Sequence, residues 1–364
     1  MSVTSDVAVD RLAVSAYRVP TDQPESDGTL EWDATTIVLV RAEAGGESGL
    51  GYTYADAAAG ELIESPLAGA VRRSDPMSPQ SAWAAMWRTV RNVGQPGLAA
   101  MAISAVDVAL WDLKARLLGV SLADLLGRFH ESVPVYGSGG FTSYSKEHLA
   151  EQMAHFAEQG LTRVKMKVGR IPTADPMRVR TARGAVGHSV ELMVDANGAY
   201  SRKEALGWAE LFGEYDVTWF EEPVTSDDLD GLRLLRDRAP AGMEIAAGEY
   251  VYKLTEAERL CDSVDVLQAD VTRCGGITGL LRMDALCRSR SLPFSAHCAP
   301  AISAHACAAM ESCRHIEYFH DHTRLEALLF DGVLDPDGGA LRPDPTRPGL
   351  GLELRESDAR EYAL

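Results

Sequence analysis

Charged and polar side chains recur at the ends of short apolar segments in the second half of the chain. They are Lys165, Lys167, Asp195, Asn197, Glu221, Glu222, Glu249, Asp270, His297 and Glu317. Three of the segments, MVDAN, WFEEP and AAGE, place an acid directly after residues that belong in a core. Carboxylates that converge without a partner repel one another and raise one another's pKa, and a bound cation relieves that repulsion. Oxygen-only ligands favour Mg²⁺, with Mn²⁺ possible, over the alternative of a salt-bridge network with the lysines.

Two further patterns point to proton transfer. Lys165 and Lys167 lie two residues apart, so on a strand both side chains point to the same face. Neighbouring ammonium groups and burial near a metal both disfavour the charged form, so one lysine can be neutral and act as a base. Asp270 and His297 end successive apolar segments. A carboxylate bonded to one ring nitrogen fixes the tautomer and raises the basicity of the other, so we expect an Asp–His pair.

The elements that must position these residues alternate regularly. Eight short apolar strands are expected at 133–138, 163–169, 191–197, 217–223, 244–250, 264–270, 293–298 and 315–320, with helical segments between them. This alternation is typical of parallel βαβ units, and eight such units close into a (β/α)8-type barrel. The carboxyl ends of barrel strands meet at one face, which holds the active site.

The first 130 residues have a different pattern. Residues 36–41 (TIVLVR) predict a strand, and the Pro-, Asp- and Gly-rich stretch 20–33 before it predicts a loop. A helix is expected through AAMAISAVDVALWDLKARLLG, because its apolar residues share one face, and Gly119 is expected to end it. From about Phe330 the chain is rich in Pro, Gly and Asp, and we expect this tail to pack back on the first domain.

Composition excludes several classes of protein. The chain has 364 residues, 46% of them hydrophobic, and a net charge of −18. That charge is the reverse of what nucleic-acid binding and anionic membranes require. All six cysteines lie between Cys261 and Cys313 without a CxxC pair, which favours reduced thiols. The N-terminus has no signal-peptide pattern, so a soluble cytoplasmic protein is expected.

Taken together, the motifs resemble the enolase superfamily and, within it, the mandelate racemase subgroup. VKMKVG, MVDANGAYS, WFEEP, AAGE, LQADVTRCGGITG and SAHCAP follow in that family's order, and the predicted helix resembles its capping-domain signature. The resemblance covers essentially the whole chain. It implies an α/β fold, with a modified (β/α)7β TIM-type barrel over residues 131–330. An α+β capping domain would be built from residues 1–130 and the C-terminal tail, 331–364.

The resemblance also implies roles for the residues at the strand ends. Mg²⁺ would be held by Asp195, Glu221 and Glu249. Lys167 would be one base, and Lys165 would tune it and contact the substrate carboxylate.

On the opposite face, His297 backed by Asp270 would be the second acid/base. Glu317 would be a protonated acid that hydrogen-bonds an enediolate intermediate. One departure is that some relatives, such as dipeptide epimerases, use a lysine base after the sixth strand, where this chain has VTRCGG. That departure argues against an epimerase of this kind.

The same residues permit two reactions on a small carboxylate substrate. We expect dehydration of an acid sugar, an aldonate or aldarate, to a 2-keto-3-deoxy acid. The alternative is a racemase or epimerase of a 2-hydroxy acid that uses the same two bases. A third possibility is a sugar-acid binding protein with a degenerate site. A homo-oligomer is also expected.

Substrate-binding residues are less well specified by the sequence, which does not say which acid is bound. The distal end of the substrate is expected to meet capping loops near 20–33 and 52–60. His320–His322 (HDH) has a zinc-ligand pattern but follows the last strand, so it is expected at most to line the pocket. The candidate substrate-binding residues are Asn197, Ser138, Tyr144, Trp32, Tyr52, Tyr54 and His320.

Overall fold

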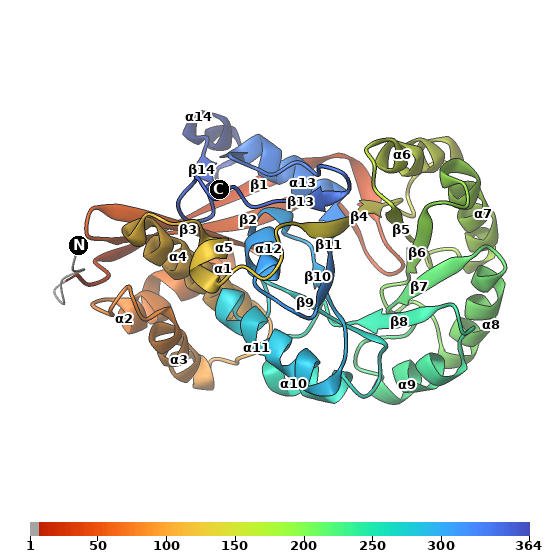
Figure 1. Ribbon diagram of the computed structural model, residues 1–364, viewed down its shortest axis with the longest axis horizontal. Coiled ribbons are helices and arrows are strands. Elements are labelled where there is room, and N and C mark those ends of the chain that lie inside the picture. The colour runs from red at the N-terminus through yellow and green to blue at the C-terminus, as the bar shows by residue number, and fades with distance from the viewer. Residues whose placement is uncertain (1–6) are drawn as a thin grey trace.

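Eight parallel strands form a closed barrel in the computed structural model, which describes residues 7–364 (Figure 1). The strands follow one another around the barrel in chain order, and β11 pairs with β4 to close it. Their bounds are β4 Val133–Gly139, β5 Arg163–Lys167, β6 Glu191–Asp195, β7 Val217–Glu221, β8 Glu244–Ala247, β9 Val266–Asp270, β10 Phe294–His297 and β11 Cys313–Phe319. Each overlaps a strand expected from the alternation of apolar and helical segments, so the predicted barrel is confirmed.

A helix follows each barrel strand and covers the outside of the sheet (Figure 1). The helices are α6 Lys146–Glu158, α7 Asp175–Val186, α8 Arg202–Gly213, α9 Leu229–Arg238, α10 Leu254–Leu260, α11 Gly276–Arg290, α12 Pro300–Ala308 and α13 His320–Leu329. The last of them, α13, departs from the usual role of an outer helix. Its Glu326 is buried and accepts hydrogen bonds from Tyr52 and Tyr54, so α13 joins the barrel to the N-terminal part of the chain.

The N-terminal part forms the expected α+β cap. An antiparallel sheet in the order β1-β2-β3 packs against the long helix α4. The bounds are β1 Arg11–Ser26, β2 Glu31–Ala44, β3 Glu47–Tyr54, α1 Ala58–Leu62, α2 Ala68–Val71, α3 Pro79–Thr89, α4 Leu98–Leu118 and α5 Leu122–Leu126. Helix α4 ends where predicted, because Gly119 adopts the left-handed conformation at φ 67°. Gly51 on β3 is required for this packing, since a Cβ there would lie 2.2 Å from the Ala105 carbonyl oxygen.

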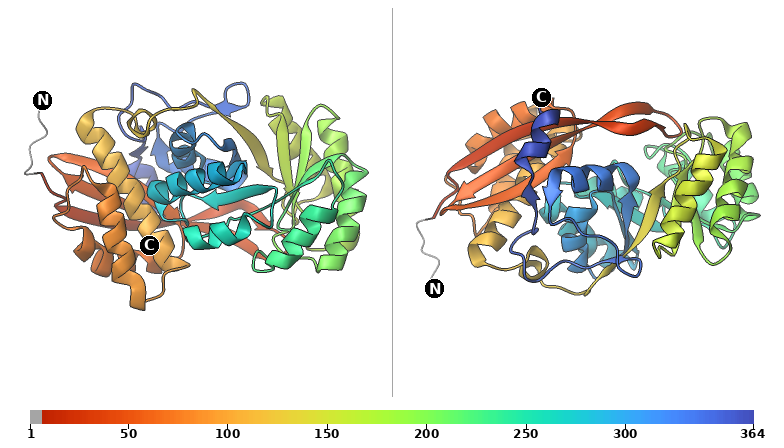
Figure 2. Two further views of the ribbon diagram at one scale, coloured as in Figure 1. Left: turned by 60° about the horizontal axis from the view of Figure 1, so that its bottom comes forward. Right: turned by 90° about the horizontal axis from the view of Figure 1, so that it is seen from above.

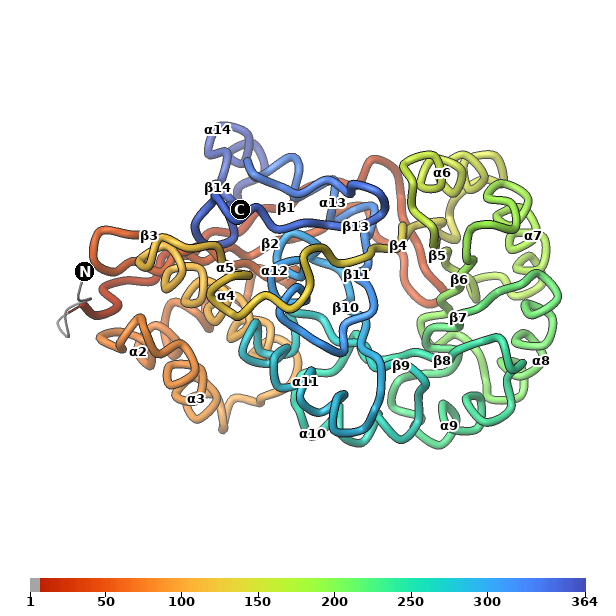
Figure 3. Tube along the Cα trace, viewed as in Figure 1, coloured from red at the N-terminus to blue at the C-terminus, as the bar shows by residue number. Residues whose placement is uncertain are grey.

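The prediction of a loop over residues 20–33 is wrong. β1 continues to Ser26 and β2 begins at Glu31, and Glu25 pairs with Trp32 across the hairpin. Composition misled here because a shift of register between Pro20 and Glu25 accommodates the prolines within a paired strand. Figure 3 shows the tip of this hairpin reaching the barrel strands. Gly28 at the tip lies so close to the barrel that a Cβ would be 2.3 Å from the Ala196 carbonyl oxygen.

The C-terminal tail runs back to the cap. It contains β12 Phe330–Asp331, β13 Ala340–Leu341, β14 Glu353–Leu354 and α14 Glu356–Ala359. The backbone N–H of Leu364 donates to Ala16 on β1 at 3.0 Å, and Figure 2 shows this end of the chain lying against β1. Arg116 on α4 donates to Glu353 at 2.6 Å. The tail is thereby tied to both the sheet and the helix of the cap.

Two further features are the state of the cysteines and the apolar character of the helices. All six cysteines are buried and free, as expected for reduced thiols. Within residues 7–364, none of the helices has both the length and the apolar character needed to span a bilayer.

Asp112 on α4 provides a test of how the cap is held together. It is fully buried and accepts hydrogen bonds at 2.6 Å from the backbone N–H groups of Leu50 and Leu350, and at 2.8 Å from Arg116. Asp112→Ala leaves these donors without a partner, so the free energy of unfolding should fall by about 3–5 kcal/mol. Chemical denaturation measures this change.

The matched control is Glu353→Ala, which removes the exposed partner of the same Arg116. That change should lower the free energy of unfolding by less than about 1 kcal/mol. Equal effects of the two substitutions would contradict a special role for Asp112.

Candidate active site

Strand register brings the predicted residues together at one end of the barrel. Lys167 on β5 is paired with Asp195 on β6, and Asp195 is paired with Glu221 on β7. On the other side of the barrel, Asp270 at the end of β9 is paired with His297 at the end of β10. Because paired residues of neighbouring parallel strands lie side by side, these side chains share the carboxyl-end mouth of the barrel.

Both lysines are buried and paired with carboxylates. Lys165 donates to Glu221 at 2.7 Å and lies 2.8 Å from Glu317, while Lys167 donates to Asp195 at 2.5 Å. Burial alone would lower the pKa of Lys165, but these carboxylates raise it well above its usual value, and Asp195 likewise raises the pKa of Lys167. The expectation that one lysine becomes neutral applied to burial near a metal and stays a prediction. The carboxylates outweigh the repulsion between the two ammonium groups.

The three predicted metal ligands are all buried acids. Asp195, Glu221 and Glu249 are between 0% and 4% exposed. Burial, followed by the charges of Asp195 and Glu317, raises the pKa of Glu221 to about 7 despite its contact with Lys165. Burial would also raise the pKa of Glu249, but His297, 2.7 Å away, keeps the pKa of Glu249 well below its usual value. The site therefore contains more buried negative charge than it can hold without strain.

Two oxygen atoms at this cluster have no hydrogen-bond partner although they are buried. They are Oε1 of Glu222 and Oδ1 of Asn197. Burial and the neighbouring Glu249 and Asp195 raise the pKa of Glu222 well above its usual value. Unpartnered buried oxygens among several carboxylates are what an oxygen-preferring divalent cation would satisfy. The donor set therefore fits Mg²⁺, although part of it is also engaged in the salt-bridge network that the sequence left as the alternative.

His297 and Asp270 form the expected pair. Nδ1 of His297 lies 2.7 Å from Oδ2 of Asp270, whose other oxygen accepts from the backbone N–H and the hydroxyl of Thr272. These contacts fix the ring, and the Asp270 carboxylate requires a proton on Nδ1. Burial disfavours a charged ring, but the nearby Cys298 sulfur and the Glu249 carboxylate raise the pKa of His297 well above its usual value.

Glu317 differs from the expectation that it is protonated. It is fully buried on β11 and accepts a hydrogen bond from Ser138 at 2.6 Å. Burial would raise its pKa, but Lys165 and His297 lower it below the usual value, which disfavours the protonated form.

A cavity of about 420 Å³ opens over these residues, between the barrel mouth and the cap. Lys167, Glu249 and His297 line its barrel side, and the hairpin tip and β3 line its cap side. A neighbouring hollow of about 580 Å³ reaches Asn197 and Glu222 from the other side, but neither lysine nor His297 lines it. The chemistry therefore belongs to the smaller cavity.

The predicted substrate-binding residues divide into two groups. Asn197, Trp32 and Tyr54 line the cavity. Four others do not line it: Ser138, Tyr144, Tyr52 and His320. Tyr52 is buried beneath the cap against Phe330, and His320 lies 3.0 Å from Asp22. Ser138 instead donates to Glu317, and the substrate-binding roles of all four residues stay predictions.

Sequence reasoning missed several residues of the cavity wall. They are Tyr250, Arg273 and Cys298. Asp27 and Asp56 also line the wall and lie in the segments 20–33 and 52–60 that were expected to meet the substrate, and His322 belongs to the HDH motif that was expected to line the pocket. Arg273 stacks on Tyr250, with 5.1 Å from the guanidinium carbon to the ring centroid. It follows Asp270 in LQADVTRCGG, so its closeness to a strand end could have identified it. Asp27 lies in the segment 20–33, which was expected to meet the substrate although its hairpin structure was not predicted.

Known families match both parts of the chain. Residues 14–127 match the family described as mandelate racemase / muconate lactonizing enzyme, N-terminal domain, and residues 148–358 match the family described as enolase C-terminal domain-like. A 3,6-anhydro-alpha-L-galactonate cycloisomerase of Streptomyces coelicolor is 31% identical, covering 95% of this chain and 97% of the relative. An L-talarate/galactarate dehydratase of Salmonella typhimurium is 30% identical, covering 97% and 90%.

Solved structures agree with this assignment. A mandelate racemase/muconate lactonizing enzyme-like protein from Rubrobacter xylanophilus superposes with a TM-score of 0.97 at 64% identity, covering 98% of this chain and 100% of that one. A racemase from Streptomyces coelicolor with bound magnesium has a TM-score of 0.92 at 29% identity, covering 98% and 100%. With the barrel, the cap and the acids at the barrel mouth, these matches show that the chain belongs to the mandelate racemase/muconate lactonizing enzyme family of the enolase superfamily.

Proposed function

We propose that this protein dehydrates an aldonate, a monocarboxylic acid sugar, to a 2-keto-3-deoxy acid. The observation that carries the proposal is that two separate proton-transfer groups, Lys167 and His297, line one cavity. Removing a proton next to a carboxylate and expelling a neighbouring hydroxyl as water require one base and one acid held at the same substrate. The similarity to a sugar-acid dehydratase and a cycloisomerase supports this class of chemistry.

The cofactor in this proposal is Mg²⁺, held by Asp195, Glu221 and Glu249. The buried, oxygen-only donor set and the unpartnered oxygens of Glu222 and Asn197 support it, as does the magnesium in a related racemase. Bound there, Mg²⁺ supplies positive charge that stabilises an enediolate formed at the substrate carboxylate.

Lys167 is the group proposed to remove the α-proton. In this structure Nζ of Lys167 donates a hydrogen bond to Asp195 at 2.5 Å, which favours the protonated lysine. A cation held by Asp195 would offset the charge that raises the pKa of Lys167, and Nζ of Lys167 would then be able to give up its proton. Lys165, fully buried and 2.8 Å from Glu317, remains charged and adds positive potential beside the substrate carboxylate.

His297 is the group proposed to protonate the departing β-hydroxyl. Asp270 holds Nδ1 in its protonated form, so Nε2 is the atom that carries the transferred proton. The Asp270 carboxylate favours the charged ring, which supports His297 as a proton donor. Loss of water leaves an enol, which becomes the 2-keto acid.

The cap side of the cavity favours a monocarboxylic acid sugar over a dicarboxylic one. The described residues that β1, β2, β3 and their connections contribute to the wall include Asp27 and Asp56, and none of these residues is lysine or arginine. Hydroxyl groups come from Thr35, Thr36 and Tyr54. This wall suits the polyol end of an aldonate, while the second carboxylate of an aldarate would face like charge.

A screen of acid sugars tests the proposed reaction. With Mg²⁺ present, aldonates should give 2-keto acid, and each should react faster than the aldarate of the same configuration. Asp56→Asn removes a charge from the cap wall and should narrow that difference. No 2-keto acid from any aldonate or aldarate would refute the dehydratase. A preference for aldarates would refute the proposal that the acidic cap side of the cavity disfavours a second carboxylate.

Substitution of the two proton-transfer groups should separate chemistry from binding. Lys167→Ala and His297→Asn should each lower kcat by roughly 10²–10⁴-fold with a smaller change in KM, because each removes a proton-transfer step. His188→Asn, whose side chain is 84% exposed, is the control and should leave kcat unchanged. Near-normal turnover in either site variant would contradict its role.

Metal dependence can be measured without turnover. Mg²⁺ at about 100 times its Kd should stabilise the protein by about 2.7 kcal/mol, seen as a rise in Tm. Asp195→Asn should weaken or abolish this rise, whereas Asp237→Asn, an exposed aspartate on α9, should preserve it. An unchanged rise in Asp195→Asn would contradict the proposed ligands.

The racemase alternative makes a different prediction in the same assays. The similarity to a racemase supports this alternative. It requires solvent deuterium to enter the α-position with inversion and without loss of water. Such exchange without any 2-keto acid would replace the dehydratase with the racemase.

A further inference from the structure

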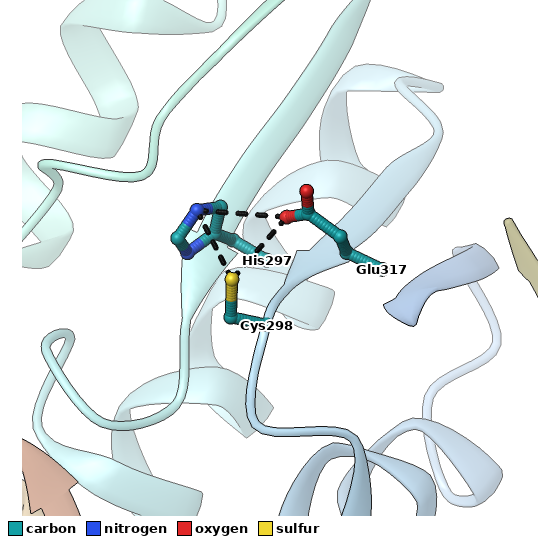
Figure 4. Close-up of side chains that lie close together, drawn as sticks. All are labelled: His297, Cys298 and Glu317. Carbon is teal, nitrogen blue, oxygen red and sulfur yellow. Dashed lines mark hydrogen bonds and ion pairs between the residues drawn. The ribbon is translucent and has the colours of Figure 1, made fainter. Parts of the chain in front are cut away.

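Three side chains at the ends of β10 and β11 form a compact triangle of possible ligand atoms (Figure 4). Sγ of Cys298 lies 3.4 Å from Nε2 of His297 and 3.5 Å from Oε2 of Glu317. The third side, from Nε2 of His297 to Oε2 of Glu317, is 3.5 Å. His297 is 5% exposed, Cys298 is 2% exposed and Glu317 is fully buried. Both His297 and Cys298 line the cavity.

The size of this triangle matches a zinc site. Tetrahedral zinc with bonds of about 2.0–2.1 Å to nitrogen, 2.3 Å to sulfur and 2.0–2.2 Å to oxygen separates its ligand atoms by about 3.4–3.6 Å. The three measured separations, 3.4, 3.5 and 3.5 Å, are the edges of one face of that tetrahedron. Water can supply the fourth ligand. Glu249, whose Oε2 lies 2.7 Å from the same ring nitrogen in this structure, would have to give up that contact when zinc binds.

The chemistry of the triangle differs from that of the proposed magnesium ligands. An imidazole, a thiolate and a carboxylate form a set that borderline-soft Zn²⁺ prefers, whereas Mg²⁺ takes oxygen ligands. Asp270 already holds a proton on Nδ1 of His297, which leaves Nε2 as the metal-binding nitrogen. The two sets therefore select different ions.

The backbone holds the thiol in place. Cys298 and Ala299 have φ angles of 50° and 44°, in the left-handed region that residues with a Cβ rarely occupy. The hydroxyl of Ser303 on α12 donates to the Cys298 carbonyl at 2.9 Å and fixes this turn. Strained backbone of this kind persists only where contacts with the surrounding structure hold it in place. Such strain is common at functional sites.

We propose that His297, Cys298 and Glu317 form an inhibitory zinc site inside the catalytic cavity. Binding displaces the thiol proton of Cys298 to solvent and places Zn²⁺ on Nε2 of His297. The ring can then no longer carry a proton to or from substrate. The binding step is independent of the proposed function, and only the inhibition rests on it.

Cobalt provides a direct test of binding, because Co²⁺ replaces Zn²⁺ and reports its ligands by absorption. The purified full chain, kept reduced and in excess Mg²⁺, is titrated with Co²⁺. We expect one tetrahedral Co²⁺ per chain, with a thiolate-to-cobalt charge-transfer band, and displacement of both signals by Zn²⁺. Cys298→Ala should lose the charge-transfer band. If the alanine variant does not fold, Cys298→Ser replaces it in the same measurement and should also lose the band.

The control is Cys261→Ala, which removes a cysteine that is 7% exposed at the end of α10, outside the cavity. It should keep the band. Absence of the band in the unaltered protein, or its persistence in the Cys298 variants, would overturn the site whatever reaction the enzyme performs.

Inhibition is measured next, as the Zn²⁺ concentration that halves turnover of the acid sugar found by the screen. Inhibition should persist when Mg²⁺ is raised and should reverse on chelation. Loss of one ligand should raise the half-inhibitory concentration roughly tenfold or more in Cys298→Ala, relative to that variant's own activity, and leave it unchanged in Cys261→Ala. Equal sensitivity in all three proteins would overturn inhibition through this site.

Discussion

Crowding of negative charge at one end of the barrel is the constraint on which the rest of the site depends. Asp195, Glu221, Glu222, Glu249, Asp270 and Glu317 are all at most 4% exposed. The described groups that oppose them are Lys165, Lys167, Arg273 and His297. Ion pairing accounts for the raised pKa values of the two lysines and of His297, and for the lowered pKa of Glu317. It leaves Glu222 with an unpartnered oxygen. A divalent cation bound to three of these acids would free their basic partners, so charge balance couples cofactor binding to the acidity of the proton-transfer groups.

The barrel makes such crowding possible because strand register is rigid. Lys167, Asp195 and Glu221 are consecutive partners across three strands, and a slip of one residue in any of them would turn a side chain away from the mouth. The apolar parts of the same strands are fully buried, as Val194 and Phe220 are. The core therefore fixes the register that positions the charges. Stability and chemistry depend on the same pairing.

Much of this arrangement follows from the sequence. Strand–helix alternation predicts the barrel, and the place of each acid at the end of an apolar segment predicts which side chains meet. Charge states could not be predicted in this way. Lys165 and Glu317 change each other's pKa because they lie 2.8 Å apart, and that distance depends on strands β5 and β11, far apart in the chain. The cap was harder to predict for a similar reason. Residues 20–33 have the composition of a loop, but pairing between β1 and β2 and contact with the barrel make them a hairpin. Long-range contacts outweighed local propensity there.

Under the proposed function, substrate selection and ion selection belong to different layers of the same cavity. Barrel strands supply the groups proposed to act on a carboxylate, and these are fixed by register. The cap supplies acidic and hydroxyl side chains from a hairpin whose tip is positioned by the close approach of Gly28 to the barrel. Cys298 belongs to the barrel layer but lies in a turn, after the last residue of β10. Register does not constrain a residue in that position, so the chain can place a thiol beside His297 without disturbing the pairing of Asp270 with the same ring. Sensitivity to a thiophilic metal can therefore be added to the site without altering the strand pairing that its chemistry requires.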